Sequence, residues 1–387
     1  MTYLNRWGLA ERILSRTPHS THMNVTIEGI SFAGSVPVAA LQERFRTLHG
    51  DSEGVTNTYC GPRRYLLDQI LLDEAASSGA DVRQAVTFTQ TIEEAGVVKG
   101  ICATTASGTT IMAHAPLVIG ADGRFSTFAK AVGAQTKDYR ELSTFAFFGY
   151  FKGIELNDVA IHKRGRLGTA MFPTSDGSHM SLVYGPTEWW SEFKADAEEN
   201  FFRTFEFCAP EMGERLRGAK REERFKGCGT MPAFQLENVG PGWALVGDAG
   251  SFKDQVTAMG ITHAFRDAEL ITNYIHTAFS GKLPLDQALA TYQQVRAADY
   301  EEYFDLVCHI AEMNAYTRAE LEHFHALSKD QARVDEFMAQ FGDTVPLSAS
   351  GPEPEVDVAS LPAHIRDFDR IVPEYLENPY RAVLVAE

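Results

Sequence analysis

The spacing of hydrophobic residues predicts where helices lie. Apolar residues recur at every third or fourth position in several stretches, which is the pattern of an amphipathic helix. Glycine follows two of these stretches, Gly79 and Gly281, and is expected to end each helix. The stretches predicted to be helical are residues 3–15, 66–78, 192–224, 261–279 and 286–328.

Alternating and continuous apolar runs predict strands elsewhere. Residues 23–38 are expected to form two strands, and residues 86–113 form hairpins whose turns are EEAG and ASGT. Residues 143–185 contain strands rich in aromatic residues, which predicts an antiparallel sheet distinct from the strands before it. Residues 116–123 and 243–249 are short apolar runs and read as buried strands.

Each of these two buried strands ends in a glycine and an aspartate. The first reads Gly120-Ala121-Asp122-Gly123 and the second reads Gly247-Asp248. Open α/β sheets bind ligands at the carboxyl ends of their strands, so a ligand site is one interpretation. The other interpretation, for Asp122 taken alone, is a carboxylate that caps a turn. Gly260 begins a helix whose first N–H groups attract an anionic ligand group.

Composition narrows the class of protein. The 387 residues predict two domains, and 44% hydrophobic with 22% charged residues is ordinary for a globular protein. A formal net charge of −17 argues against nucleic acid as a partner. Five scattered cysteines argue against disulfides and a metal site, and favour a reducing, cytoplasmic location. No apolar run is long enough for a membrane span, and the N-terminus is not a signal peptide.

Three motifs carry a family resemblance over residues 1 to about 300. "GADGRFS" resembles the second nucleotide-binding fingerprint of FAD-dependent class A monooxygenases, the para-hydroxybenzoate hydroxylase fold, and "GDAGSFKDQVTAMGITHAFRDAEL" resembles their third. "PRRYLLDQILLDEAASSGADV" is similar to the helix between them. The resemblance implies an α/β fold, in which a Rossmann-like, three-layer FAD-binding domain carries an antiparallel-sheet substrate domain and a helical C-terminus. The implied parts are 1–22 and 60–142 (FAD-binding), 23–59 and 143–235 (substrate sheet), 236–300 (FAD-binding, with the Gly-Asp motif), and 301–387 (helical C-terminal region and tail).

The resemblance also implies roles for individual residues. Asp248 would bind the ribityl or ribose part of FAD, and Arg64, at the start of the helix, would contact the cofactor. The start of the last helix would lie beside the flavin pyrimidine. The complete set of implied cofactor-binding residues is Arg64, Asp122, Gly123, Gly247, Asp248, Gly260, Ile261 and Thr262.

The sequence departs from the family pattern in several places. The printed chain contains no G-x-G-x-x-G, the loop that cradles the pyrophosphate of a dinucleotide, so we expect an N-terminally truncated FAD-binding domain. Ala129 stands where the family usually has Arg, with Lys130 beside it, and Gln255 replaces a usual Pro. His263 stands where the family is often acidic or amide, and we expect a polar surface or helix-cap contact there rather than a catalytic role.

The implied activity is monooxygenation, in which NAD(P)H and O2 serve to hydroxylate or epoxidise an apolar or aromatic small molecule. The residues predicted to form either the roof of the substrate site or plain core are Phe145, Phe147, Phe148, Tyr150 and Phe172. A flavin-dependent halogenase is an alternative, although the Trp-x-Trp-x-Ile-Pro motif of that branch is absent. A prenyl reductase and a non-catalytic remnant of the fold are the others. The sequence assigns no catalytic residue and no oligomeric state.

Overall fold

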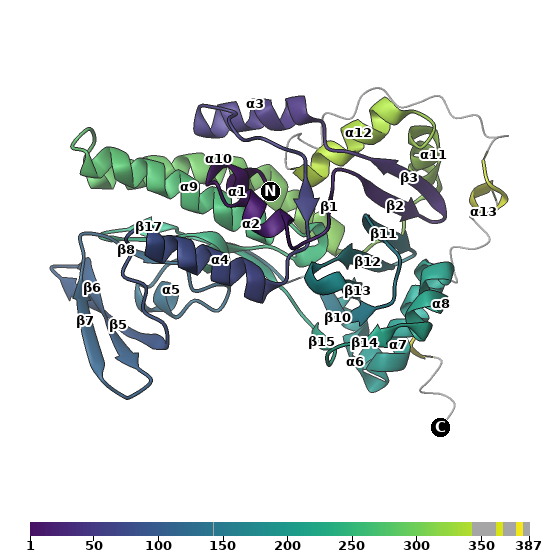
Figure 1. The fold of residues 1–387 in the computed structure, drawn as a ribbon, viewed down its shortest axis with the longest axis horizontal. Helices are drawn as coiled ribbons and strands as arrows, with labels where there is room; N and C mark the ends of the chain where they lie inside the picture. The colour runs from purple at the N-terminus through teal and green to yellow at the C-terminus, as the bar shows by residue number, and fades with distance from the viewer. Residues whose placement is uncertain (142, 343–360, 367–376, 382–387) are drawn as a thin grey trace. The chain divides into compact units, whose positions relative to one another are not determined.

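The computed structural model describes residues 1–141, 143–342, 361–366 and 377–381. The chain divides into two compact units (Figure 1). The first comprises Met1–Ile70, Ser143–Met231 and His309–Glu387, and the second comprises Leu71–Leu142 and Pro232–Cys308. Two helices, α4 (Arg64–Ser77) and α10 (Leu285–Ala311), run from one unit into the other along the sequence.

The first unit is built on an eight-stranded sheet with the order β14-β10-β13-β12-β11-β2-β3, in which β15 also pairs with β10. Only β2 and β11 pair in parallel among its described pairs. The strands of this unit are β1 (His19–Ser20), β2 (Met23–Ile27), β3 (Ile30–Gly34), β4 (Tyr59–Cys60), β10 (Thr144–Lys152), β11 (Val159–Arg164), β12 (Leu167–Pro173), β13 (His179–Pro186), β14 (Lys220–Arg221) and β15 (Lys226–Cys228). Its α-helices are α1 (Thr2–Arg6), α2 (Ala10–Leu14), α3 (Val38–His49), α6 (Trp190–Ala195), α7 (Ala197–Cys208), α8 (Pro210–Gly218), α11 (Arg318–Leu327), α12 (Gln331–Ala339) and α13 (Ala363–Arg366).

One face of this sheet packs against α6, α7 and α8. Successive residues of a strand point to opposite faces, so the odd-numbered residues of β10 share one face. Phe145 lies 4.7 Å from the ring of Phe193 in α6, and Phe151 stacks 5.8 Å from Phe201 in α7. All four rings are buried, so this face forms the core of the sheet–helix layer.

A second core lies where β2 and β3 meet the C-terminal helices. Phe32 of β3 packs against Phe337 of α12, and the cluster extends to Ile365, which is fully buried. Tyr380 is also buried, and its hydroxyl lies 2.7 Å from that of Thr204. In the described part of the C-terminal tail, both of these side chains therefore fill apolar cores.

The second unit contains three small sheets and two long helices. Its strands are β5 (Val86–Glu94), β6 (Val97–Thr105), β7 (Thr110–His114), β8 (Val118–Gly120), β9 (Thr136–Arg140), β16 (Ala233–Leu236), β17 (Val239–Gly240), β18 (Trp243–Leu245) and β19 (Ser251–Phe252). Strands β5, β6 and β7 form an antiparallel meander, and β17, β18 and β8 form the sheet that ends in the two corners. Helices α5 (Thr127–Ala131), α9 (Gly260–Phe279) and α10 complete the unit, and α9 and α10 lie side by side (Figure 1).

Most predicted elements are observed, but two predicted helices are divided. The helix predicted over 192–224 is three helices that end at Gly218, and the helix predicted over 286–328 is interrupted between Ala311 and Arg318. The helices at 66–78 and 261–279, the two strands within 23–38 and the hairpins within 86–113 are all confirmed. The single helix predicted over 3–15 is instead two short helices, because Gly8 between them has a φ of 73°, which helical residues do not adopt.

Candidate functional site

The two Gly-Asp corners lie at one edge of one sheet in the second unit. Strand β8 pairs in parallel with β18, and Gly120 lies opposite Leu245. The Val246 N–H donates to the Gly120 carbonyl at 3.0 Å, so the pairing continues to the point where both strands end. Parallel strands place their carboxyl ends together, and the chain therefore leaves both strands at the same edge.

The first corner uses its aspartate to begin a helix. The Asp122 carboxylate accepts hydrogen bonds from the Ser126 hydroxyl at 2.5 Å and from the Thr127 and Phe128 N–H groups at 2.8 and 3.1 Å. Burial raises the pKa of this carboxyl, but these hydrogen bonds outweigh burial and bring the pKa below its ordinary value. The capping interpretation of Asp122 is what the geometry shows, and its contact with a cofactor stays a prediction, as does that of Gly123.

The second corner packs closely against α9. Gly247 has a φ of 55°, and a Cβ added there would lie 3.2 Å from the Cβ of Ala264. Its N–H donates to Oδ2 of Asp267 at 2.9 Å, so two residues of α9 contact this one glycine. Asp248 itself is half-buried. The corner therefore has a backbone conformation and a close approach that favour glycine at position 247.

At the start of α9 the backbone is exposed, because Gly260 has no side chain to cover it. Gly260 is exposed, and a Cβ added there would have no atom within 4 Å. The N-cap residue, Met259, makes no side-chain hydrogen bond to the first turn, which also contains no acidic residue. Ile261 is 45% exposed and Thr262 is half-buried. This helix end therefore keeps its partial positive charge without a capping carboxylate of its own.

A buried ionic cluster lies behind the second corner, and sequence reasoning missed it. Asp267 is fully buried and pairs with Arg296 of α10, whose Nε donates to Oδ2 at 2.8 Å. Arg266 is buried beside it and pairs with Asp299. Burial of the Asp267 carboxyl raises its pKa, yet the charges of Arg296 and Arg266 outweigh burial and hold the pKa below its ordinary value. The sequence did contain a signal for this cluster, because Arg266-Asp267 are two adjacent charged residues inside the apolar helical pattern of 261–279.

His263 is a buried residue of this same region. Only 2% of the side chain is exposed, and its ring lies 5.5 Å from that of Tyr300 and 4.9 Å from that of Tyr303. The expected surface position is therefore wrong, because α10 covers this position of α9 with tyrosine rings. The helix-cap contact stays a prediction. At the departure from the usual Asp-Pro, the Asp254 side chain accepts the Val256 N–H at 3.0 Å and caps a short turn.

Arg64 lies in the first unit, where its Nε donates to Asp68 Oδ1 at 2.8 Å one turn along α4. Its side chain is 70% exposed. The assignment of Arg64 as a cofactor contact stays a prediction.

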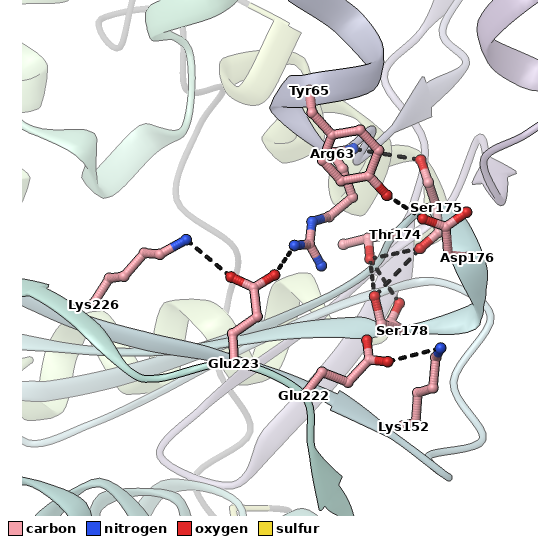
Figure 2. A network of polar contacts seen from close by, with 10 residues as sticks. All are labelled: Arg63, Tyr65, Lys152, Thr174, Ser175, Asp176, Ser178, Glu222, Glu223 and Lys226. Carbon is pink, nitrogen blue, oxygen red and sulfur yellow. Dashed lines mark hydrogen bonds and ion pairs between the residues drawn. The ribbon is translucent and has the colours of Figure 1, made fainter.

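A polar network holds the residues around Arg64 to the sheet of the first unit (Figure 2). The Arg63 guanidinium lies 3.6 Å from the centre of the Tyr150 ring and pairs with Glu223, which also pairs with Lys226 at 3.0 Å. The Tyr65 hydroxyl donates to Asp176 at the turn between β12 and β13. The start of α4 is thus anchored within the same unit on both sides of Arg64, to β10 and Glu223 through Arg63 and to the β12–β13 turn through Tyr65.

The predicted aromatic roof divides between the two faces of the large sheet. Phe145 belongs to the core with α6, and Phe147, of the same strand face, packs against that core. Phe148, Tyr150 and Phe172 are half-buried, and strand alternation places the first two on the opposite face. Met180 lies opposite both Tyr150 and Phe172 in the strand pairing, so Phe172 belongs to that face as well. This second face, with Leu182 opposite Phe148, is a half-buried apolar surface.

The residues that the structure describes contain no group of three or more His, Cys, Asp or Glu side chains that could hold a metal ion. None of the helices in the described part of the chain combines the length and apolar character that crossing a bilayer requires. The five cysteines, which all lie in that part, form no disulfide, and Cys102 and Cys208 are buried.

Most of the chain matches a known protein family. Residues 1–306 match the family model described as FAD binding domain. The chain belongs to this family. The predicted resemblance and fold class are thereby confirmed.

Individual relatives are distant. Tryptophan 2-halogenase from Chondromyces crocatus is 22% identical over 264 residues, which cover 65% of this chain and 50% of the relative. The chain thus spans about half the length of that curated relative. The solved structure of flavin-dependent brominase Bmp2 is 16% identical with a TM-score of 0.71, covering 96% of this chain and 86% of that one. The structure of pqsL, a probable FAD-dependent monooxygenase from Pseudomonas aeruginosa, is 17% identical with a TM-score of 0.62, covering 88% and 86%. At these identities the two structures establish a shared fold.

The residues of the second unit fit the flavin half of FAD. An uncapped helix end with open space over Gly260 can face the edge of a flat ring that becomes negatively charged on reduction. Gly247 and Asp248 supply a close backbone approach and a half-buried carboxylate for a polyhydroxyl chain. For the adenine-dinucleotide half, the printed sequence holds no G-x-G-x-x-G loop.

Proposed function

We propose that this protein binds FAD at the edge where β8 and β18 end and uses it as an oxidoreductase. The single observation that carries the proposal is the parallel pairing of β8 with β18, which brings both Gly-Asp corners to one edge. Membership of the FAD binding domain family supports the choice of ligand. When bound, the flavin supplies the electron-transfer and oxygen chemistry of the reaction.

The protein's own groups would hold and polarise the ring. Asp248 would accept hydrogen bonds from the ribityl or ribose hydroxyls, and Gly247 would allow the backbone to approach them. The first N–H groups of α9, from Gly260 onward, would face the pyrimidine edge of the flavin. Their partial positive charge would stabilise negative charge on that edge.

The reaction we propose is monooxygenation of an apolar or aromatic small molecule, with NAD(P)H as electron donor and O2 as co-substrate. The half-buried face of the large sheet, which carries Phe148, Tyr150 and Phe172, supports this class of substrate. Flat apolar molecules gain most from contact with aromatic side chains in a site that excludes water.

Titration of the full chain with FAD tests the binding step. We expect the protein to quench flavin fluorescence, and Asp248→Ala to weaken binding by about 10- to 100-fold, which is the effect of removing hydrogen bonds to a charged group. Asp138→Ala is the matched control, because Asp138 is an acidic residue of the same unit that pairs with Arg140 at 2.8 Å. A wild-type chain that retains no flavin contradicts the proposal.

Halogenation is the second candidate, and the likeness to Tryptophan 2-halogenase favours it. The two reactions differ in their products. Incubation with FAD, a flavin reductase, NADH, O2 and bromide, followed by mass spectrometry of a panel of aromatic substrates, separates them. A product that gains one oxygen without bromide supports monooxygenation, whereas a brominated product that appears only with bromide supports halogenation.

A further inference from the structure

Asp267 connects three elements of the second unit through one carboxylate. It lies on α9, its Oδ2 accepts the Gly247 N–H at 2.9 Å, and the same oxygen accepts Nε of Arg296 on α10 at 2.8 Å. Its other oxygen, Oδ1, lies 3.3 Å from Nη2 of Arg266. The Asp267 side chain is completely buried. Every hydrogen bond it makes is therefore shielded from competition with water.

Helix α10 also contacts the end of β18, on the other side of the bend that Gly247 forms. The Tyr292 hydroxyl donates to the Leu245 carbonyl at 3.1 Å, two residues before Gly247. The Tyr300 ring lies under both arginines, 4.2 Å from the Arg266 guanidinium and 4.4 Å from that of Arg296. The cations that keep Asp267 ionised are thus themselves fixed by aromatic packing.

The bend needs this support because its backbone is unusual. Gly247 has a φ of 55°, and the site for a Cβ there is closed by Ala264, which precedes Asp267 by three residues on the same face of α9. One turn of α9 thus contacts Gly247 twice, through a close approach and through a hydrogen bond. This fixes the distance between the corner at Asp248 and the start of the helix at Gly260.

We propose that Asp267 is a positioning residue for flavin. It holds the Gly247–Asp248 corner and the start of α9 at a fixed distance from each other, so that the corner contacts the sugar chain while the helix start contacts the ring. This inference rests on the proposed function, because it concerns the same site. Asp267 itself does not touch the ligand. Arg296 and Arg266 act one step further away by keeping the carboxylate charged and oriented.

Two variants of the 387-residue chain test this role. The double variant Asp267→Leu with Arg296→Leu removes the acceptor of the Gly247 N–H without leaving a buried charge unpaired, so the fold has an apolar replacement of similar volume. Asp267→Asn keeps an acceptor oxygen and removes the charge. Asp299→Asn is the matched control, because it removes the charge of another buried carboxylate that pairs with Arg266 on the same two helices.

Flavin affinity and hydrogen exchange of the Gly247 amide are the two measurements. We expect the double variant to weaken FAD binding by about tenfold or more and to accelerate Gly247 exchange by a similar factor, in line with the loss of a buried hydrogen bond. Asp267→Asn should fall between wild type and the double variant. Asp299→Asn should lower the melting temperature yet change both readouts by less than about twofold.

The possible failures can be told apart. Wild-type affinity and wild-type Gly247 exchange in the double variant overturn the positioning role, and so does Asp299→Asn if it weakens FAD binding as much. Should the double variant not fold, Asp267→Asn decides, since unchanged affinity and exchange there overturn the role too. A wild-type protein that binds no FAD overturns the proposed function first, before any variant is compared.

Discussion

Gly120 lies directly opposite Leu245 in the parallel pairing of β8 with β18. The residues that follow them, Asp122 at one corner and Asp248 at the other, leave the sheet at the same edge. The two corners are held in different ways, because the Asp122 carboxylate accepts the first N–H groups of α5, whereas the Gly247 N–H of the second corner donates to Asp267 of α9.

Two glycine substitutions should have opposite effects on stability and the same effect on flavin binding. Gly260→Ala meets open space and improves helix propensity, so we expect the protein without flavin to gain up to about 1 kcal/mol. Gly247→Ala should lose more than about 1 kcal/mol, because its φ is positive and Ala264 closes the site. Both should weaken FAD binding, since both backbones are proposed to approach the ligand.

Thermal unfolding with and without FAD measures both effects. Bound ligand raises the melting temperature according to its affinity, so the shift on adding FAD should shrink in both variants. A Gly260→Ala protein that is more stable and keeps the full wild-type shift would show that no ring lies against the start of α9.

Arg64→Ala should separate cofactor contact from surface pairing. The ion pair with Asp68 is exposed and spans one helical turn, so its loss should cost no more than about 0.5 kcal/mol. If Arg64 contacts FAD, the variant should nevertheless bind FAD about tenfold more weakly. Asp68→Ala breaks the same pair and is the control. Equal affinities of the two variants would contradict the assignment of Arg64.

The part of this site that local sequence determines was predictable. Apolar periodicity located α9, and the end of each apolar run at Gly-Asp located both corners, because each depends on residues close together in the chain. The ionic cluster was not predictable in the same way. Asp267 pairs with Arg296, 29 residues away, and only the packing of α10 on α9 brings them together.

Long-range packing also explains the error at His263 and why the aromatic sheet left two interpretations open. His263 appeared to face solvent because nothing local indicates that Tyr300 and Tyr303 cover it. Alternation correctly groups Phe145 with Phe147 and Phe148 with Tyr150. Alternation does not indicate which face of the sheet packs against α6. The contact of Phe145 with Phe193 depends on a helix more than 40 residues further along the chain.

Acidification should reveal the structural role of Asp122. Its pKa lies below the ordinary value of 3.8, so its charged form stabilises the fold fully above about pH 4, and this contribution is lost as the pH falls through the lower folded pKa. Asp122→Asn should be less stable than wild type at neutral pH, and the difference should shrink below about pH 4. Urea unfolding at several pH values measures it. A difference that persists unchanged to the acid limit would contradict this role.

The two faces of the large sheet should respond differently to truncation of neighbouring phenylalanines. Phe145 is fully buried against Phe193, so Phe145→Ala should cost about 3–5 kcal/mol of unfolding free energy. Phe148 is half-buried on the opposite face, so Phe148→Ala should lower the unfolding free energy much less.

If that face binds the substrate, Phe148→Ala should raise KM for an apolar substrate while the affinity for FAD is kept. Urea unfolding, FAD titration and steady-state kinetics on both variants distinguish these effects. An unchanged KM in a folded, flavin-loaded Phe148→Ala protein would exclude Phe148 from the substrate site.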